Sequence, residues 1–335
     1  MNDLRVCELF SGIGGFRLGL EKASNKFQTV YANELDKWAA SIYRHHWSDG
    51  TLCEGDIKSI QAKDIPDFDI LCGGFPCQPF STAGKRSEFK DPRGTLIYEI
   101  IRLAKEKQPK MLLLENVPGL LNIQKGQTFQ TILEELGNLG YLCEWKVFNS
   151  KFFGVPQSRR RVFIVAYLAT PRQGGRTFFP IGNSNNMGAA KSQGQVCGTL
   201  TAGYGGRCGG DTYLIVDYQF GKTRIYADTA PTLIARMGTA GRKWNMLTIC
   251  TADRRLRKLI PLECERLQGF PDHWTKYGLT ATGEQIEISN TQRYKTVGNA
   301  VTTNVIAEIG KLILTFFENS HIPDLANQKN MEEHL

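Results

Sequence analysis

The stretch ELFSGIGGF, residues 8–16, lies between an apolar run and a segment with helical periodicity. The apolar run over residues 4–10 predicts a buried strand, and the following pattern predicts a helix over residues 16–23. Gly12 and Gly14 allow the connecting turn to be tight and let its backbone approach a ligand closely. In an open α/β sheet such a turn lies at the carboxyl edge, where ligands bind. We therefore expect a nucleotide-type site at this first strand–helix turn.

Strand and helix patterns alternate from the N-terminus to about residue 167. Strands are expected over residues 4–10, 27–32, 69–72, 111–114 and 161–167, and helices over 16–23, 36–45, 97–105 and 128–139. This alternation predicts an α/β fold with a doubly wound, parallel, Rossmann-like sheet. An amphipathic pattern over residues 301–317 predicts a C-terminal helix that packs back on this sheet.

Residues 169–253 differ in composition from the rest of the chain. They are rich in glycine, show no helical period, and carry nine Lys or Arg residues against four Asp. Two segments, CGTLTAGYGGR (197–207) and APTLIARMGTAGR (230–242), share Thr-Leu-x-Ala followed by glycine and arginine. We expect three parts: a large domain over residues 1–169, a smaller, mostly β or irregular domain over 170–275, and a hinge with the returning helix over 276–335.

Two acidic residues extend the candidate ligand site. Glu34 follows the glycines by about 20 residues, at the end of the second expected strand, where a carboxylate accepts hydrogen bonds from ribose hydroxyls. Asp56 is expected at the end of the third strand, where an adenine amino group would lie. A dinucleotide needs a third glycine at position 17 to seat its pyrophosphate on the helix, but this residue is Arg17. S-adenosylmethionine carries no phosphate, so the pattern favours this cofactor over NAD.

Composition limits the class of protein. A net charge of +8 suits a polyanionic partner such as nucleic acid. Nine cysteines without a Cys-x-x-Cys pair indicate reduced thiols, with neither a disulfide framework nor a metal site. The sequence has no run of about 18 apolar residues that would predict a membrane span. Its first residues, MNDLRVCELF, lack the regions of a signal peptide, so we expect a cytosolic protein without a membrane partner.

The stretch GGFPCQPFS, residues 73–81, places Cys77 between two prolines directly after an expected strand. A cysteine thiolate is a strong nucleophile. Methyl transfer to nitrogen or oxygen needs no such group, because these atoms already carry a lone pair. Carbon 5 of cytosine, in contrast, becomes nucleophilic only after a thiolate has added at carbon 6. Cys77 is therefore a candidate nucleophile for methyl transfer to an aromatic carbon.

These motifs resemble those of the bacterial cytosine-5 DNA methyltransferases of restriction–modification systems. The resemblance covers nearly the whole chain, and the motifs occur in the family's order: ELFSGIGGF, GGFPCQPFS, DPRGTL (91–96), ENVPGLL (115–121), GVPQSRRRVFIVA (154–166), IPLECERLQGFP (260–271) and VGNAV (297–301). The resemblance implies an S-adenosylmethionine-dependent methyltransferase sheet, with the smaller domain as the target-recognition domain.

The resemblance also implies roles for individual residues. Cys77 would be the nucleophile, and Glu115 would contact N3 and the amino group of the cytosine. Arg159 and Arg161 would hold the base and Glu115. Leu35 stands where the family often has a tryptophan that packs on the adenine, which puts cofactor affinity rather than activity in question. The residues that would enclose the cofactor are Phe10, Gly12, Gly14, Glu34, Leu35, Asp56, Ile57, Gly74, Pro76, Leu96, Asn299 and Ala300.

By the same resemblance, the substrate is a cytosine flipped out of a short, specific sequence of double-stranded DNA. The residues expected to contact DNA are Gln78, Ser81, Arg207, Arg236, Arg242 and Lys243. The implied setting is the bacterial cytoplasm, where a monomer would act beside a cognate restriction endonuclease. Two alternatives stay open: a cytosine-5 methyltransferase that acts on tRNA, and a catalytically silent homologue that binds DNA.

Overall fold

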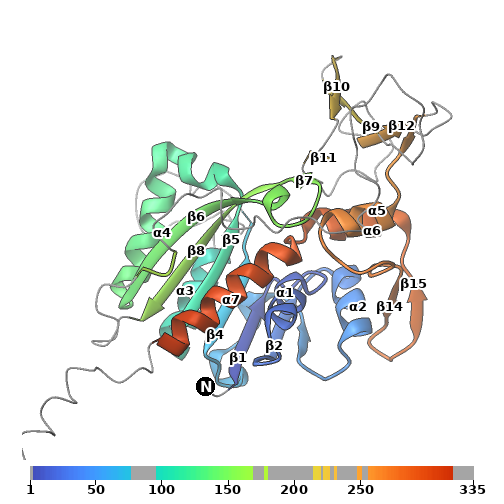
Figure 1. Cartoon of the computed structure of the whole chain (residues 1–335). Helices are drawn as coiled ribbons and strands as arrows, with labels where there is room; N and C mark the ends of the chain where they lie inside the picture. The colour runs from blue at the N-terminus through green and yellow to red at the C-terminus, as the bar shows by residue number, and fades with distance from the viewer. Residues whose placement is uncertain are drawn as a thin grey trace, which may run out of the picture.

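The computed structural model describes residues 3–76, 96–168, 177–179, 214–219, 222–226, 230–231, 247–250 and 256–319. Within these residues the largest sheet has seven strands in the order β3-β2-β1-β4-β5-β8-β6 (Figure 1). The strands are β1 (Leu4–Leu9), β2 (Phe27–Glu34), β3 (Leu52–Glu54), β4 (Ile70–Gly74), β5 (Met111–Asn116), β6 (Tyr141–Asn149) and β8 (Arg160–Leu168). The α/β, doubly wound, Rossmann-like fold predicted from the sequence is confirmed.

One strand of this sheet runs against the others, which differs from the wholly parallel sheet expected. β8 lies between β5 and β6 and is antiparallel to both, whereas β1 to β5 pair in parallel. A short connection suffices between antiparallel neighbours, while a parallel pair needs a long crossover. β6 is missing from the expected elements, because the polar residues Glu144 and Lys146 obscure its strand pattern.

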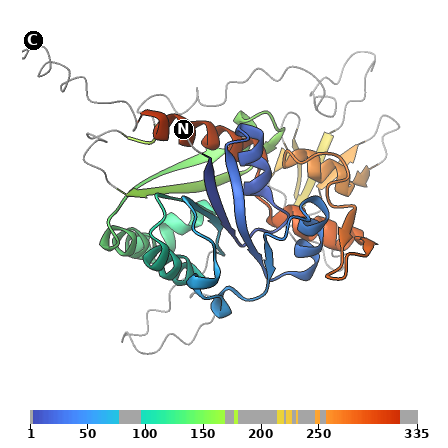
Figure 2. The ribbon, with the colours of Figure 1, turned by 90° about the horizontal axis from the view of Figure 1, so that it is seen from below.

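Helices cover both faces of the sheet, and the alternating side chains of its central strands fill two apolar cores. Val6 and Leu113 face a core formed with α1 and α7, whereas Leu71 and Leu112 face a core formed with α3 and α4. Figure 2 shows α7 on one side of the sheet and the α3–α4 pair on the other. The helices are α1 (Gly15–Ala23), α2 (Lys37–His46), α3 (Leu96–Lys107), α4 (Gln127–Asn138), α5 (Pro261–Leu267), α6 (Asn290–Asn299) and α7 (Thr303–Asn319).

A third core lies beside the carboxyl edge of the sheet. It joins Ile13 and Ile42, from the first part of the chain, to Leu267, Trp274 and Val297 from the last part. It thereby places α5 and α6 next to α2. The adjoining short elements are a hairpin, β14 (Tyr277–Leu279) and β15 (Gln285–Glu287), and the 3₁₀ helices η1 (Ile57–Ser59), η2 (Ala62–Asp64), η3 (Pro118–Gly126) and η4 (Ser150–Phe152).

The stretch Asn290–Asn319 is apolar and long enough, by composition and length alone, to qualify as a membrane span. It is nevertheless two helices, α6 and α7, separated at Ala300 by extended backbone. α7 by itself has 17 residues, about 25 Å of helix, which is short for a bilayer core. Its residues Ile306, Ile309 and Ile313 are buried against α1 and the sheet. Burial in the protein core thus accounts for the apolar composition.

The strands between residues 214 and 258 form a second, four-stranded antiparallel sheet in the order β10-β9-β12-β13. A further pair of strands links this part of the chain to the segment just before β8, because β11 (Ala230–Pro231) pairs in parallel with β7 (Gln157–Ser158). The β structure agrees with the character expected for the smaller domain, while the domain boundaries stay a prediction. The strands of the second sheet are β9 (Leu214–Gln219), β10 (Lys222–Tyr226), β12 (Leu247–Cys250) and β13 (Leu256–Lys258).

Candidate functional site

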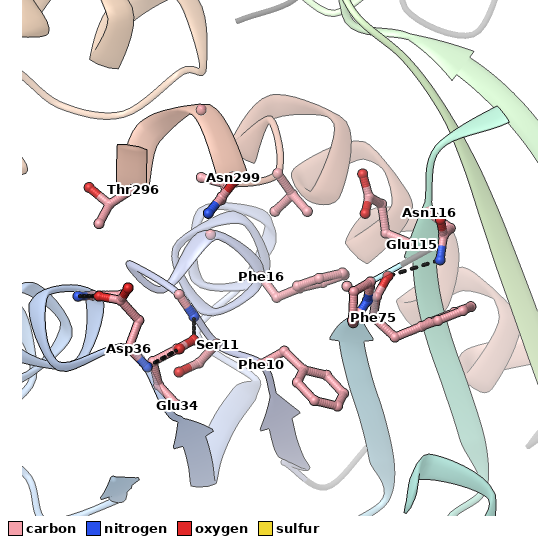
Figure 3. A pocket seen from close by; sticks show the side chains of 18 of the residues that line it. Phe10, Ser11, Phe16, Glu34, Asp36, Phe75, Glu115, Asn116, Thr296 and Asn299 are labelled. Atoms are coloured by element: carbon pink, nitrogen blue, oxygen red, sulfur yellow. Dashed lines mark hydrogen bonds between the residues drawn. The ribbon is translucent and has the colours of Figure 1, made fainter. Parts of the chain in front are cut away.

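A cavity of about 400 Å³ lies at the carboxyl ends of β1, β2, β4 and β5, opposite the joint between α6 and α7 (Figure 3). It is elongated, with Glu34 at one end and Glu115 at the other. Its lining residues are Phe10, Ser11, Gly12, Gly15, Phe16, Glu34, Asp36, Ala39, Gly74, Phe75, Pro76, Glu115, Asn116, Val117, Arg159, Arg161, Lys295, Thr296, Gly298, Asn299, Ala300 and Val301.

The turn after β1 forms the floor of the cavity and uses the left-handed backbone region. Phe10, Gly12 and Gly14 have φ values of 54°, 57° and 80°. A Cβ on Gly12 would meet no atom within 4 Å, which is consistent with its position on the open cavity. A Cβ on Gly14 would lie 2.1 Å from the ring of Trp47. Gly12 is therefore a lining residue, whereas Gly14 is required by packing behind the turn.

Glu34 closes one end of the cavity and is anchored by backbone donors. One carboxylate oxygen accepts a hydrogen bond from the Gly12 N–H at 2.6 Å. The other oxygen accepts bonds from the N–H groups of Leu35 and Asp36 at 2.9 and 2.7 Å. Burial raises the pKa of Glu34, and these hydrogen bonds act in the opposite direction. Its carboxyl group is thus held in one orientation at the end of β2.

An ion pair joins the two walls at this same end. Asp36 caps the N-terminus of α2 by accepting bonds from the N–H groups of Trp38 and Ala39. Its second oxygen pairs with Lys295 on α6. The interaction with Lys295 and the two capping bonds lower the pKa of Asp36, although its partial burial opposes them. The pair therefore links the start of α2 to α6 across the cavity mouth.

Glu115 and Arg161 form the other end of the cavity. The Arg161 Nε lies 2.9 Å from a Glu115 carboxylate oxygen, and both side chains are largely buried. A Cβ on Gly74 would lie 3.2 Å from the second Glu115 oxygen, so glycine leaves room for this side chain at the end of β4. Burial raises the pKa of Glu115, while Arg161 and Arg159 act in the opposite direction. The environment thus favours a protonated carboxyl group more than water does.

The backbone at the end of β4 is fixed by the residue after Glu115. The Asn116 amide donates a hydrogen bond to the Phe75 carbonyl at 2.9 Å, and its oxygen accepts one from the Val117 N–H. Phe75 and Pro76 both line the cavity. The chain therefore reaches Pro76 at a fixed point beside Glu115. The predicted residues Cys77, Gln78, Ser81, Arg207, Arg236, Arg242 and Lys243 lie outside the described residues.

Not all predicted cofactor residues line the cavity. Leu35 is 66% exposed and does not line the cavity, and Ile57 is buried in the core that is formed with α3 and α4. Asp56 does not end the third strand as expected, since β3 ends at Glu54 and Asp56 caps η1 through the Lys58 N–H. Leu96 begins α3 and packs partly on the same core as Ile57. The predicted cofactor residues that do line the cavity are Phe10, Gly12, Glu34, Gly74, Pro76, Asn299 and Ala300.

The structure also adds residues that the sequence analysis missed. Ser11 is buried within the glycine turn, and Phe16 and Val301 line the cavity. Asp36 and Lys295 line its Glu34 end. A local signal existed for Ser11, inside SGIGG, and for Lys295, two residues before VGNAV. The ion pair of Asp36 with Lys295 carries no such signal.

Comparison with known proteins identifies the family. The family model described as C-5 cytosine-specific DNA methylase matches residues 4–176 and 210–315. The chain belongs to this family. It is therefore a DNA (cytosine-5-)-methyltransferase, and the resemblance seen in its motifs is confirmed.

Individual relatives agree with this placement. The chain is 35% identical to the Type II methyltransferase M1.ScrFI of Lactococcus lactis subsp. cremoris, over 94% of this chain and 79% of that protein. It is also 35% identical to the Type II methyltransferase M.NlaX of Neisseria lactamica, over 92% of this chain and 95% of that protein. The crystal structure of the S. pombe Dnmt2 methyltransferase shares the fold, with a TM-score of 0.63 at 19% identity, over 93% and 98% of the two chains.

Proposed function

We propose that this methyltransferase transfers the methyl group of S-adenosylmethionine to carbon 5 of a cytosine flipped out of double-stranded DNA. The observation that carries the proposal is one elongated cavity whose two ends differ chemically (Figure 3). Glu34 at one end suits a ribose, and the Glu115–Arg161 pair at the other suits a pyrimidine edge. A methyl donor and a base bound in one cavity are close enough for direct transfer.

The residues of the Glu34 end fit S-adenosylmethionine, which supplies an electrophilic methyl group when bound. Ser11 Oγ is buried at the cavity and has no hydrogen-bond partner among the described residues. The Glu34 oxygen bonded to Gly12 N–H keeps a second lone pair for a ribose hydroxyl. The open space above Gly12 lets a ligand lie against the backbone. The unpartnered Ser11 hydroxyl, the Glu34 carboxylate and the Gly12 backbone thus all line the same part of the cavity.

We assign the nucleophile to Cys77, which directly follows the cavity residue Pro76. Its thiolate would form a bond to carbon 6 of the cytosine, and the ring electrons released by this addition would make carbon 5 nucleophilic. Carbon 5 would then form a bond to the methyl carbon, and the donor would leave as S-adenosylhomocysteine, with the electron pair of the broken carbon–sulfur bond on its sulfur. Transfer of the carbon 5 proton to water would return the electron pair to the ring, break the bond from Cys77 to carbon 6 and release the thiolate.

Glu115 would assist the addition by donating a proton or hydrogen bond to N3 of the cytosine. Its raised pKa supports this role, because the protonated carboxyl group is a donor and the carboxylate is not. Arg161 holds the Glu115 side chain through the 2.9 Å contact of its Nε. A fixed donor at N3 draws off the charge that the thiolate pushes into the ring.

The base must leave the duplex to reach this cavity, at a cost of a few kcal/mol in stacking and pairing. We propose that residues 170–275, which include the four-stranded antiparallel sheet, bind the duplex and read a short target sequence. The basic residues Arg207, Arg236, Arg242 and Lys243 are candidates for this contact, as are Gln78 and Ser81 beside Cys77.

The relatives support a restriction–modification setting, since M1.ScrFI and M.NlaX are both named Type II methyltransferases. We propose that this enzyme protects DNA from a cognate endonuclease in the bacterial cytoplasm. One chain supplies both ends of the cavity, which supports action as a monomer.

The test is incubation with unmethylated plasmid and labelled S-adenosylmethionine, followed by sequencing that maps 5-methylcytosine. We expect label at carbon 5 of cytosine in one short recurring sequence, and no turnover by a Cys77→Ser variant that still binds cofactor. Label on tRNA but not on the plasmid would reject the DNA substrate. Near-normal methylation by Cys77→Ser would reject the covalent mechanism.

A further inference from the structure

The segment from Gln157 to Arg161 contacts several parts of the molecule in succession. The Gln157 side chain is fully buried and donates a hydrogen bond to the Leu267 carbonyl at 2.8 Å. The Arg159 carbonyl accepts a hydrogen bond from the Ser150 N–H, and the Arg159 N–H donates one to the Ser150 hydroxyl. Arg161 pairs with Glu115. These contacts hold the backbone of this segment in place and therefore fix the positions of the Cα atoms from which the Arg159 and Arg161 side chains extend.

Arg159 extends from this segment to the end of α6. Its side chain is 4% exposed, and its Nη2 donates hydrogen bonds to the carbonyls of Gly298 and Ala300 at 3.3 and 2.9 Å. The last carbonyls of a helix lack intrahelical partners and carry partial negative charge, so a cation stabilises them. Arg159 thus caps the C-terminus of α6 with a buried positive charge.

Asn299 lies between these two carbonyls and lines the cavity. Figure 3 shows its side chain on the wall opposite Phe10 and Glu34. A second buried side chain holds the same turn, because the Gln268 amide donates to the Val297 and Ala300 carbonyls at 3.2 and 3.3 Å. The position of Asn299 therefore depends on two buried donors, and of these two Arg159 reaches the flanking carbonyls from the Glu115 end.

The electrostatics of the Glu115 end also bear on Arg159. The Arg159 side chain is buried and that of Arg161 is largely buried, and both lower the pKa of the Glu115 carboxyl group, which burial raises. Burial lowers the pKa of Arg159, and repulsion from Arg161 lowers it further. The helix-end carbonyls of α6 offset part of this cost. The positive charge of Arg159 is therefore stabilised by two groups: the carbonyls at the C-terminal end of α6 and the Glu115 carboxylate.

We propose that Arg159 is a positioning residue for the cofactor end of the cavity: it holds Asn299 in the wall that faces Glu34. The inference rests on the proposed function, since it assigns that end to S-adenosylmethionine. It separates Arg159 from Arg161, whose pairing with Glu115 belongs to the base end. Cofactor affinity then depends on Arg159 even when no DNA is present.

The experiment measures binding of S-adenosylhomocysteine to the full chain by calorimetry, without DNA. The variants are Arg159→Met, Arg159→Lys, Arg161→Met and Arg160→Met. Arg160→Met is the matched control, because it makes the same chemical change one residue away at an exposed position. Thermal unfolding of each variant establishes that the protein tested is folded. Binding by the wild type is the separate test of the proposed cofactor.

We expect Arg159→Met to weaken binding about tenfold, the effect of losing a hydrogen bond to a charged group. Arg159→Lys should recover part of the affinity, since an ammonium group can still donate to one carbonyl. Arg160→Met and Arg161→Met should bind within about twofold of wild type. In turnover assays the KM for S-adenosylmethionine should rise in Arg159→Met more than kcat falls.

Wild-type affinity in a folded Arg159→Met protein would overturn the inference, as would a fall in kcat with an unchanged cofactor KM. If Arg159→Met does not fold, Arg159→Lys decides in the same way: unchanged affinity and KM reject the positioning role. An equal loss of affinity in Arg161→Met would also reject it, because the effect would then belong to the arginine pair as a whole.

Discussion

Three buried or half-buried glutamates at the sheet edge have different chemical tasks because their surroundings differ. Glu34 accepts three backbone N–H bonds and is fixed as an acceptor. Glu115 faces two arginines in the cavity. Glu8 is fully buried below α1, where one oxygen accepts bonds from the Phe16 and Arg17 N–H groups. Burial raises the pKa of each, and the neighbours decide by how much.

The raised pKa of Glu115 predicts how the rate depends on pH. If the protonated carboxyl group donates to N3, kcat falls as pH rises through this pKa, because the donor is lost. A Glu115→Gln variant keeps an amide donor that does not titrate, so its lower kcat should lack this decline. The check is kcat against pH at saturating cofactor and DNA. A decline of equal shape in Glu115→Gln would assign it to another group.

The buried Glu8 predicts a pH-dependent stability. Its pKa rises from 4.5 to about 8 on folding, mainly through burial. Between these values the folded state keeps a proton that the unfolded state has lost, so Glu8 makes stability fall with rising pH by about 1.4 kcal/mol per unit. Glu8→Gln should therefore show a smaller loss of unfolding free energy between pH 5 and pH 8. Urea titrations at the two pH values test this, and an unchanged difference would contradict it.

At the scale of elements, the packing of α1 on α7 depends on small residues in both helices. A Cβ on Gly19 would lie 2.4 Å from the Ile306 Cβ and 2.8 Å from the Thr303 carbonyl oxygen. A Cβ on Gly310 would lie 2.8 Å from the Cβ of Ala23. The helix axes are therefore close because glycines face the contact from both sides. This contact fixes the start of α7 and so the α6–α7 joint above the cavity.

Gly19→Ala should destabilise the protein by about 1–3 kcal/mol, because the added methyl group forces α1 and α7 apart. This cost exceeds the gain of roughly 1 kcal/mol that alanine brings to an isolated helix. Gly137→Ala in α4 is the matched control, since a Cβ there meets no atom within 4 Å. It should be neutral or stabilising in urea denaturation. Equal unfolding free energies of the two variants would contradict the prediction, because α1 and α7 would then accommodate the added methyl group without loss of stability.

At the scale of the whole molecule, an aromatic cluster joins the last part of the chain to the first. Trp274 stacks on His46 with ring centroids 3.4 Å apart and meets Trp47 edge-on at 5.5 Å. Its indole N–H donates to the Ile13 carbonyl at 3.0 Å, within the glycine turn. Burial lowers the pKa of His46 to about 4, so the ring is neutral at pH 7. The cluster thereby holds the glycine turn after β1 against the segment after α5.

Trp274→Ala should cost about 3–5 kcal/mol of unfolding free energy, as expected for a large buried aromatic side chain. It should also weaken S-adenosylhomocysteine binding, because the Ile13 carbonyl loses its donor. Trp145→Ala is the control, since Trp145 is 47% exposed on the edge strand β6 and should cost far less. Denaturation and calorimetry measure both effects. If the Trp274→Ala protein were as stable as Trp145→Ala, the aromatic cluster would not be what holds the last part of the chain to the first.

Prediction from the sequence succeeded where the signal is local. The alternation of apolar runs and helical periods predicted β1, α1, β2, α2, β5, α4 and α7 within a few residues, because each pattern lies within one element. The same approach missed β6 and the antiparallel direction of β8, since strand direction depends on which neighbour pairs with it. Among site residues, Gly12, Glu34, Glu115 and Asn299 were predicted from motifs and do line the cavity.

The amino-acid order alone thus specified the α/β class, the glycine turn and the motif residues, because backbone freedom, periodicity and residue chemistry are properties of short segments. Only the folded chain decided which side chains share the cavity. Asp36 and Lys295 pair although 259 positions separate them, and Arg159 reaches the Ala300 carbonyl at the end of α6 across a gap of 141 positions. Such contacts arise because parallel strands bring their carboxyl ends to one edge, where α6 and α7 return from the other end of the chain.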